Sequence, residues 1–286
     1  MRRRCPTRRA TLSGDMTKVK ICGLTRPEDA KMAVQEGAWA LGMIMWPASP
    51  RHCEPSRAAA IADEHRRSTE IAGVFVDQPL DEVVNLTNEI GLTMVQFHGD
   101  EGLKFCTTVA QRTGARVTKS FRVQNRSVLA EMGKFFDVDY HLLDSYRAGV
   151  PGGTGQTFDW SFLESHPRRG NVPLILSGGL TPENVTEAIA AVRPFAVDVA
   201  SGVESAPGIK DADKLRAFFS AVRSVPTTED EESVPVTGTD EEVLTLGFAR
   251  RELAETAALR AVEADEKVKA EQQAAEAESE SPEEGA

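Results

Sequence analysis

Two residues that can carry out proton chemistry follow apolar runs in this sequence. Cys22 comes directly after Val19–Ile21 and before Gly23, and Asp144 comes after Tyr140–Leu143. A partly desolvated carboxyl can hold a proton near neutral pH, as a general acid must. A free cysteine is usually a small buried hydrophobe, and an acid in such a place often caps a loop or pairs with an arginine. Each residue is therefore a catalytic candidate with a structural alternative.

Two glycine-containing segments follow later apolar runs and predict an anion site. They are Ser177-Gly178-Gly179 and Ala200-Ser201-Gly202. Glycines let backbone N–H groups approach an anion, and Thr181-Pro182 predicts the start of a helix whose positive end faces it. Such a site needs no lysine or arginine. A third segment, residues 149–156, is rich enough in glycine for a mobile lid, although glycines also make ordinary turns.

Other polar residues at the ends of apolar runs give weaker signals. Arg51 could clamp a carboxylate with two hydrogen bonds, but a single loop arginine is usually solvated. His98 could act as an acid or base, although an orienting role is the better interpretation. Asp198 lies within an apolar run, where a buried acid needs a partner. Cys53 and Cys106 are interpreted as structural.

The elements that position these residues are eight short apolar or β-branched runs, which predict buried parallel strands. They cover residues 19–22, 40–45, 71–76, 94–97, 117–121, 140–144, 173–177 and 196–200. Eight strand–helix units at this spacing favour an α/β fold that closes into a single (β/α)8 barrel, with an open doubly wound sheet as the alternative. No nucleotide-binding glycine motif follows any of the runs, which argues against that alternative. In a barrel the residues named above meet at the carboxyl ends of the strands.

Helix boundaries are predicted from capping signals. Residues 25–28 read as a capping box with Pro27 at the first helical position, and Thr181-Pro182-Glu183 gives a second start. Gly37 and Gly91 lie where helices should end.

Charge and composition limit the partners of this 286-residue chain. Residues 226–286 contain 18 acidic and 5 basic residues, which leaves the rest of the chain at a net charge of +2. A neutral body without a basic stripe and an acidic tail argue against binding nucleic acid or an anionic membrane. No run approaches the length of a membrane span, and the cysteines lack metal-binding spacing. We expect a cytoplasmic protein that acts on a small molecule.

The two ends fall outside the strand–helix pattern. Residues 1–16 contain five arginines and no apolar segment, so they predict a disordered extension or an untranslated leader before Met16. Residues 226–286 predict a disordered or partly helical tail. The barrel is expected to span residues 17–225.

Together these motifs resemble those of phosphoribosylanthranilate isomerases. The resemblance runs from about Lys18 to Val222 and rests on these segments, taken in order along the chain: KVKICGLT (18–25), WPASPR (46–51), GVFV (73–76), VQFHG (95–99), LD (143–144), GGTG (152–155) with TFDW (157–160), LSGGL (176–180) and VDVASGVE (197–204).

The resemblance implies an Amadori rearrangement of N-(5-phosphoribosyl)anthranilate to 1-(2-carboxyphenylamino)-1-deoxyribulose 5-phosphate in tryptophan biosynthesis, without a metal or other cofactor. It implies that Asp144 is the general acid and Cys22 the general base. It also implies a substrate-binding set of Arg51 for the anthranilate carboxylate, His98, Gly153, Gly178, Gly179, Asp198, Ser201 and Gly202. A monomer or a homodimer is expected.

Two departures from the family pattern would weaken binding rather than proton transfer: Gln156 stands where many relatives have lysine, and Ala200 where many have serine. Two other functions remain open. A related histidine-pathway or dual-substrate isomerase uses two aspartates, and Cys22 argues against it. A catalytically silent phosphate-binding barrel is the second.

Overall fold

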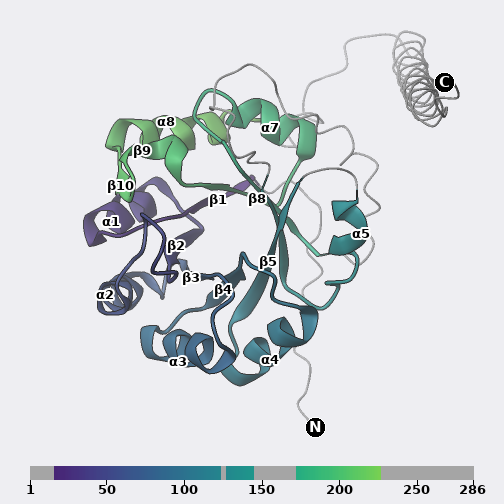
Figure 1. Ribbon diagram of the computed structural model, residues 1–286. Helices are drawn as coiled ribbons and strands as arrows, with labels where there is room; N and C mark the ends of the chain where they lie inside the picture. The colour runs from purple at the N-terminus through teal and green to yellow at the C-terminus, as the bar shows by residue number, and fades with distance from the viewer. Residues whose placement is uncertain (1–15, 124–126, 145–171, 227–286) are drawn as a thin grey trace, which may run out of the picture. The chain divides into compact units, whose positions relative to one another are not determined.

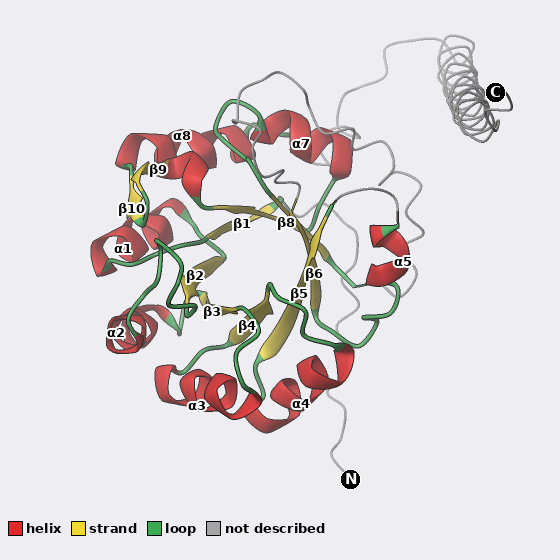
Figure 2. Ribbon diagram, in the orientation of Figure 1, coloured by secondary structure: helices red, strands yellow, loops and turns green. Residues whose placement is uncertain are grey.

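A computed structural model describes residues 16–123, 127–144 and 172–226 of the chain. The predicted lid, Gly153 and Gln156 within it, and both predicted terminal extensions lie outside the described residues. Within the described part, eight parallel strands close into a barrel in sequence order, β1 to β8. Figure 2 shows the strands as an inner ring with the helices outside it. The predicted barrel is therefore confirmed.

The strands lie within one or two residues of the predicted runs. They are β1 Lys18–Ile21, β2 Ala40–Ile44, β3 Glu70–Phe75, β4 Met94–Phe97, β5 Arg116–Arg122, β6 Tyr140–Asp144, β7 Leu174–Ser177 and β8 Ala196–Val199. Both faces of these strands are largely buried, which is why most of the runs are rich in apolar residues.

The helices surround the barrel (Figure 1). They are α1 Pro27–Glu36, α2 Pro55–His65, α3 Leu80–Ile90, α4 Leu103–Thr113, α5 Val128–Met132, α7 Val185–Val192 and α8 Ala212–Arg223. As predicted, Pro27 opens α1, and α1 and α3 end at Gly37 and Gly91, whose φ angles are 98° and 76°. After β8 come a short 3-10 helix, Ser201–Val203, and a small hairpin of β9 Glu204–Ala206 and β10 Ile209–Lys210, which the sequence did not predict.

The predicted Thr25 capping box of α1 and the predicted start of α7 are wrong. Arg26, not Thr25, occupies the N-cap position of α1, and its side chain makes no capping hydrogen bond. The Thr25 hydroxyl donates instead to the Gly208 carbonyl at 2.6 Å. Helix α7 begins at Val185 rather than at Thr181. Thr181 belongs to a preceding turn, in which its N–H donates to Asn184 Oδ1 at 2.8 Å.

The hydrophobic core has two parts on opposite faces of the strands. The larger part packs the outer strand faces against the helices. A smaller cluster, made of Ala72, Met94, Tyr140, Leu142, Ile175 and Ala196, comes from alternate strand positions. Those positions also carry buried Lys20, Gln96, Thr118, Ser120 and Asp198. Because side chains alternate along a strand, these polar groups share the inner face of the barrel.

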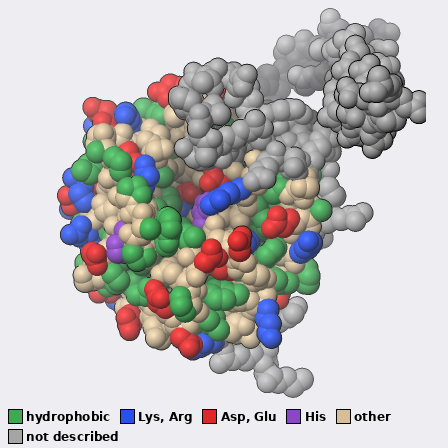
Figure 3. Space-filling model, in the orientation of Figure 1, with side chains coloured by type: hydrophobic (Ala, Val, Ile, Leu, Met, Phe, Trp, Pro, Cys, Tyr) green, Lys and Arg blue, Asp and Glu red, His purple; other side chains and the backbone are tan. Residues whose placement is uncertain are grey.

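The described outer surface has no one-sign stripe on the face seen in Figure 3, where acidic and basic side chains are interspersed. No described helix is long and apolar enough to cross a membrane.

Candidate active site

Cys22 lies immediately beyond β1, on the inner face of the barrel and at its carboxyl end. Its N–H donates to the Val199 carbonyl at 2.9 Å, which ties the end of β1 to the end of β8. The residue is 7% exposed. A Cβ added at Gly42 on β2 would lie 3.0 Å from both the Cys22 Sγ and the Lys20 Nζ. A side chain at position 42 would crowd both groups.

Two charged residues accompany the Cys22 thiol inside the barrel. Lys20 lies opposite Asp198 in the β1–β8 register, and its Nζ donates to Asp198 Oδ1 at 2.9 Å. Burial raises the pKa of Cys22, and the ammonium of Lys20 opposes this increase. Burial also works against the charge of Lys20, but Asp198 and Cys22 outweigh it and raise the pKa of Lys20. Lys20 is therefore a cation held beside the thiol.

The expected partner of Asp198 is thus Lys20, which was not among the residues predicted from the sequence. Ser177 Oγ also donates to Asp198 Oδ2, at 3.5 Å. Asp198 is 5% exposed, and both of its carboxylate oxygens accept hydrogen bonds. This pairing satisfies the buried carboxylate.

Asp144 is the last residue of β6 and lies at the same end of the barrel. It is adjacent in register to Arg122 of β5 and Ser177 of β7. His98 Nε2 lies 3.4 Å from Asp144 Oδ2, and both side chains are partly exposed. The structure therefore places the predicted orienting histidine beside the predicted acid.

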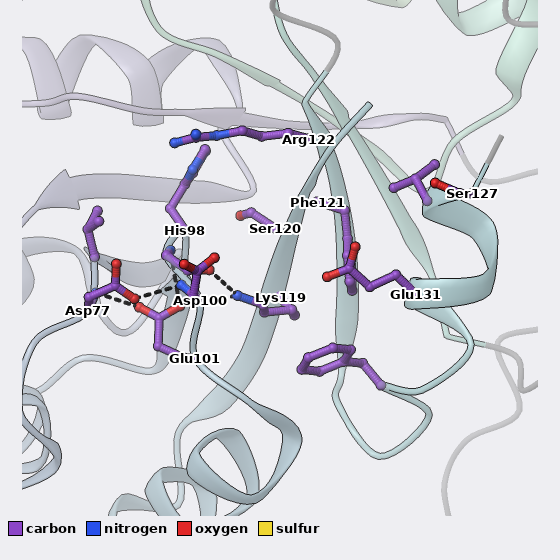
Figure 4. A pocket seen from close by; sticks show the side chains of 14 residues that line it. Asp77, His98, Asp100, Glu101, Lys119, Ser120, Phe121, Arg122, Ser127 and Glu131 are labelled. Carbon is purple, nitrogen blue, oxygen red and sulfur yellow. Dashed lines mark hydrogen bonds and ion pairs between the residues drawn. The ribbon is translucent and has the colours of Figure 1, made fainter. Parts of the chain in front are cut away.

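The His98–Gly99 turn is fixed by a buried ion pair on the outer side of the strands. Glu101 accepts hydrogen bonds from the N–H of Gly99 at 3.0 Å and of Asp77 at 2.8 Å. Lys119 Nζ donates to the Gly99 carbonyl at 2.5 Å and to Glu101 at 3.1 Å. Figure 4 shows this network next to His98. It holds the histidine in one place at the strand end.

A pocket of about 530 Å³ adjoins this network, between the ends of β4 and β5 and α5. Its described lining includes His98, Arg122, Lys119, Val128 and Phe135. Figure 4 shows the side chains of His98, Arg122 and Lys119 around it. Since odd-numbered β5 residues point toward the helices, most of this pocket lies outside the inner barrel face. It borders the candidate site through His98.

Arg51 lies in the loop after β2 and is not a solitary solvated side chain. Its guanidinium makes a bidentate pair with Glu204: Nη2 donates to Oε2 at 2.8 Å and Nε donates to Oε1 at 3.0 Å. The hydrogen bond to Glu204 raises the pKa of Arg51. Glu204 stands in the quoted family motif, but nothing local in the sequence pairs it with a residue 153 positions away.

The predicted glycine segments after β7 and β8 lie against each other. Gly178 and Gly179 have φ angles of 95° and 65°. A Cβ added at Gly202 would overlap the Leu180 carbonyl oxygen, so the two loops are in direct contact at this point. Ser201 begins the 3-10 helix that follows β8. The structure thus brings the four predicted phosphate residues to one side of the barrel end.

The other two described cysteines, Cys53 and Cys106, lie outside the candidate site. Cys53 precedes α2 and Cys106 lies within α4; both are fully buried. Burial raises the pKa of each thiol to about 11. Their structural interpretation fits this environment. In the described residues, no group of three or more histidine, cysteine, aspartate or glutamate side chains could hold a metal ion.

A chain of neighbouring residues, here called the contact path, links Asp144 to Cys22 around the carboxyl end of the barrel. It runs from Asp144 to its register neighbour Ser177, from Ser177 to Asp198, and from Asp198 to Lys20 beneath Cys22. A closed parallel barrel with such groups at the carboxyl ends of its strands defines an enzyme of the β/α-barrel class.

Comparison with known proteins identifies the family within this class. The profile of N-(5'-phosphoribosyl)anthranilate isomerase matches residues 19–221. The isomerase of Geotalea uraniireducens is 46% identical over 210 residues, which is 73% of this chain and 100% of the relative. The chain belongs to the phosphoribosylanthranilate isomerase family of tryptophan biosynthesis.

Solved structures support the same family assignment. The Thermotoga maritima phosphoribosylanthranilate isomerase is 39% identical, with a TM-score of 0.67 over 73% of this chain and 99% of its own. A further structure of a phosphoribosylanthranilate isomerase contains reduced 1-(o-carboxyphenylamino)-1-deoxyribulose 5-phosphate. It is 38% identical, with a TM-score of 0.64 over the same shares of the two chains.

Proposed function

We propose that this chain isomerises N-(5-phosphoribosyl)anthranilate to 1-(2-carboxyphenylamino)-1-deoxyribulose 5-phosphate with Asp144 as the general acid and Cys22 as the general base. The observation that carries this proposal is the position of the two side chains. Both stand at the carboxyl end of one barrel, linked by the contact path through Ser177, Asp198 and Lys20. Reactive groups of this fold lie at that end.

The proposed reaction begins with proton transfer from Asp144 to the furanose ring oxygen. The bond from C1 to that oxygen breaks, and the nitrogen lone pair forms an iminium at C1. The iminium acidifies the C2 hydrogen, which the Cys22 thiolate removes to give an enolamine. Loss of the C2 hydroxyl proton and protonation of C1 then give the ketone. Two protons are added, at the ring oxygen and C1, and two are removed, from C2 and its hydroxyl. C1 is reduced while C2 is oxidised within the same molecule, so no redox partner is required.

Lys20 supports the base role of Cys22 in this scheme. The thiol must lose its proton, and burial disfavours the resulting thiolate. A neighbouring ammonium stabilises the thiolate, and Lys20 accordingly acts to lower the pKa of Cys22. Asp198 holds that ammonium in place through the 2.9 Å hydrogen bond. We therefore assign Lys20 and Asp198 to the environment of the base.

Substrate binding is proposed at two places. The phosphate binds at the loop segments of Gly178, Gly179, Ser201 and Gly202, where the backbone turns tightly and the two loops touch. The anthranilate carboxylate binds at Arg51, whose planar fork suits a carboxylate. His98 contacts the substrate near Asp144. Gly153 is also proposed to bind the substrate, and it lies outside the described residues.

The proposed site comes from one chain, so a monomer or a homodimer could carry it. We also propose a cytoplasmic location and a phosphorylated small molecule as the substrate. The charge pattern that argues against nucleic acid applies here as well.

The test is turnover of freshly generated phosphoribosylanthranilate, followed by loss of its fluorescence. Purified protein should consume this substrate with a first-order rate constant that is proportional to enzyme concentration. Turnover of the histidine-pathway substrate at a comparable rate would instead identify a dual-substrate enzyme. No turnover of either substrate would indicate a silent phosphate-binding barrel.

A further inference from the structure

The hairpin of β9 and β10 contributes two buried charges that the proposed proton transfers do not use. They are Glu204 and Lys210, whose side chains are 4% and 0% exposed. Lys210 Nζ donates to Glu204 Oε1 at 3.0 Å, and Glu204 in turn accepts from Arg51. Buried charges are costly unless they are paired, so this arrangement calls for an explanation.

Glu204 occupies one edge of the Arg51 guanidinium. Arg51 Nε lies 3.0 Å from each Glu204 oxygen, and Nη2 lies 2.8 Å from Oε2. Within the described residues, Arg51 Nη1 donates no hydrogen bond to the protein. A guanidinium has a second edge, made of Nη1 and Nη2, that can donate two hydrogen bonds to a carboxylate in the same plane. The Arg51 side chain is 23% exposed, so a ligand can reach it from solvent.

The stem of Arg51 is placed by Gly23, the residue after Cys22. Gly23 has a φ angle of 72°, and a Cβ there would lie 2.8 Å from Arg51 Cδ. The arginine side chain therefore crosses directly over the backbone next to the proposed base. Its far end is fixed by Glu204.

Lys210 connects Glu204 to both strand ends of the site. Its Nζ donates to the carbonyls of Cys22 at 2.6 Å and Ala200 at 3.0 Å, in addition to Glu204. An ammonium has three hydrogens, so these three acceptors satisfy it. The carboxylate that holds Arg51 is thus tied to the backbone of Cys22.

The ionisation of Glu204 agrees with this arrangement. Burial works against the charged carboxylate, but hydrogen bonds and positive charge from Arg51 and Lys210 outweigh it and lower the pKa of Glu204. Glu204 is then ionised at neutral pH and accepts both arginine hydrogen bonds.

We infer that Glu204 is a positioning residue for substrate recognition: by holding the Nε–Nη2 edge of Arg51, it directs the Nη1–Nη2 edge toward the anthranilate carboxylate. This inference rests on the proposed carboxylate role of Arg51. Lys210 anchors Glu204 relative to Cys22, so that the carboxylate site and the base keep a fixed relation.

The test compares two ligands by calorimetric titration. One is reduced 1-(o-carboxyphenylamino)-1-deoxyribulose 5-phosphate, and the other is the same molecule without its ring carboxylate. Glu204→Gln should weaken binding of the first about tenfold, the scale of one charge-assisted hydrogen bond, and change the second less than about twofold. Equal losses for both ligands, or none for either, would overturn the inference.

Two further variants separate the inference from the proposed function. Arg51→Ala should remove the preference for the carboxylate ligand, and adding Glu204→Gln to it should cause no further ligand-specific loss. If Arg51→Ala keeps the preference, the proposed carboxylate role fails. If Arg51→Ala removes the preference for the carboxylate ligand but Glu204→Gln does not weaken that preference, only the proposed role of Glu204 fails.

Controls address charge and folding. Asp213→Asn removes a similar charge from the exposed Asp213–Arg216 pair of α8 and should leave both affinities unchanged. If Glu204→Gln does not fold, Glu204→Asp keeps the charge facing Lys210 but shortens the reach to Arg51. The same carboxylate-selective loss is expected for it, and an unselective one would count against the inference.

Discussion

Lys20 Nζ and Asp198 Oδ1 are joined by a 2.9 Å hydrogen bond inside the barrel, and Cys22 lies two residues beyond Lys20 on the same face. The two partners act on the Cys22 thiol with opposite signs. Lys20 lowers the pKa of Cys22, and Asp198 raises it, on top of the larger increase caused by burial. The pH dependence of the reaction should respond to each partner separately.

Lys20→Met should move the acidic limb of kcat/KM to higher pH. Loss of the cation disfavours the thiolate, so less of the enzyme is in the base form at any pH on that limb, and kcat/KM there should fall by about tenfold. The measurement is a kcat/KM profile from pH 6 to 10. Asp198→Asn should move the same limb to lower pH. A limb that moves in the same direction for both variants would contradict this account.

Gly42→Ala should impair the site through crowding. Its methyl group would lie 3.0 Å from the Cys22 Sγ and 3.2 Å from the Cys22 Cα, and that backbone atom cannot turn aside. Overpacking of this kind costs about 1–3 kcal/mol, so both the melting temperature and kcat should fall. Gly102→Ala is the matched control, since a Cβ there meets nothing within 4 Å. Equal effects of the two substitutions would show that Gly42 has no special role.

Arg51→Lys keeps the positive charge but loses the planar fork. We expect KM to increase about tenfold, on the scale of 1.5–3 kcal/mol for a hydrogen bond to a charged group, with kcat little changed. Steady-state kinetics with phosphoribosylanthranilate measure both constants. A variant with unchanged KM and kcat would place Arg51 outside the binding site.

A chain shortened to residues 16–225 should fold and remain active. The 210 residues that match the Geotalea uraniireducens isomerase are the whole of that relative, which supports a complete barrel without the terminal segments. Circular dichroism and the turnover assay measure the outcome. Aggregation or loss of most of the activity would mean that a terminal segment stabilises the barrel.

The strands could be predicted because most are apolar or β-branched runs, and a barrel buries both faces of each strand. Several candidate site residues could be located for a related reason, since Cys22 and His98 directly follow strands and Asp144 ends one. Local pattern was enough for these positions.

Long-range partners could not be predicted in the same way. Lys20 pairs with an acid 178 residues away, and Arg51 with one 153 residues away. Thr25 reads as a helix cap, yet its hydroxyl bonds Gly208 across the fold. The β9–β10 hairpin is too short to show periodicity, so Glu204 and Lys210 were missed. Register and loop packing, which decide these contacts, leave no local signal.

In the proposed reaction, Cys22 and Asp144 transfer the protons. Positioned acid–base groups typically contribute ~10²–10⁴ in rate, so Cys22→Ser and Asp144→Asn should each lower kcat by at least about 10². Binding of the reduced product analogue should survive, because the proposed phosphate and carboxylate contacts lie elsewhere. Cys53→Ser and Cys106→Ser, in buried thiols away from the site, should leave kcat almost unchanged.

The most direct single measurement is the kcat of Cys22→Ser in the fluorescence assay, beside Cys106→Ser. The account predicts a loss of about 10² or more for Cys22→Ser alone, with the thiol of the unaltered protein protected by substrate against alkylation. A Cys22→Ser enzyme with nearly full kcat would contradict the account, and Asp198 would then be the first residue to examine as the base.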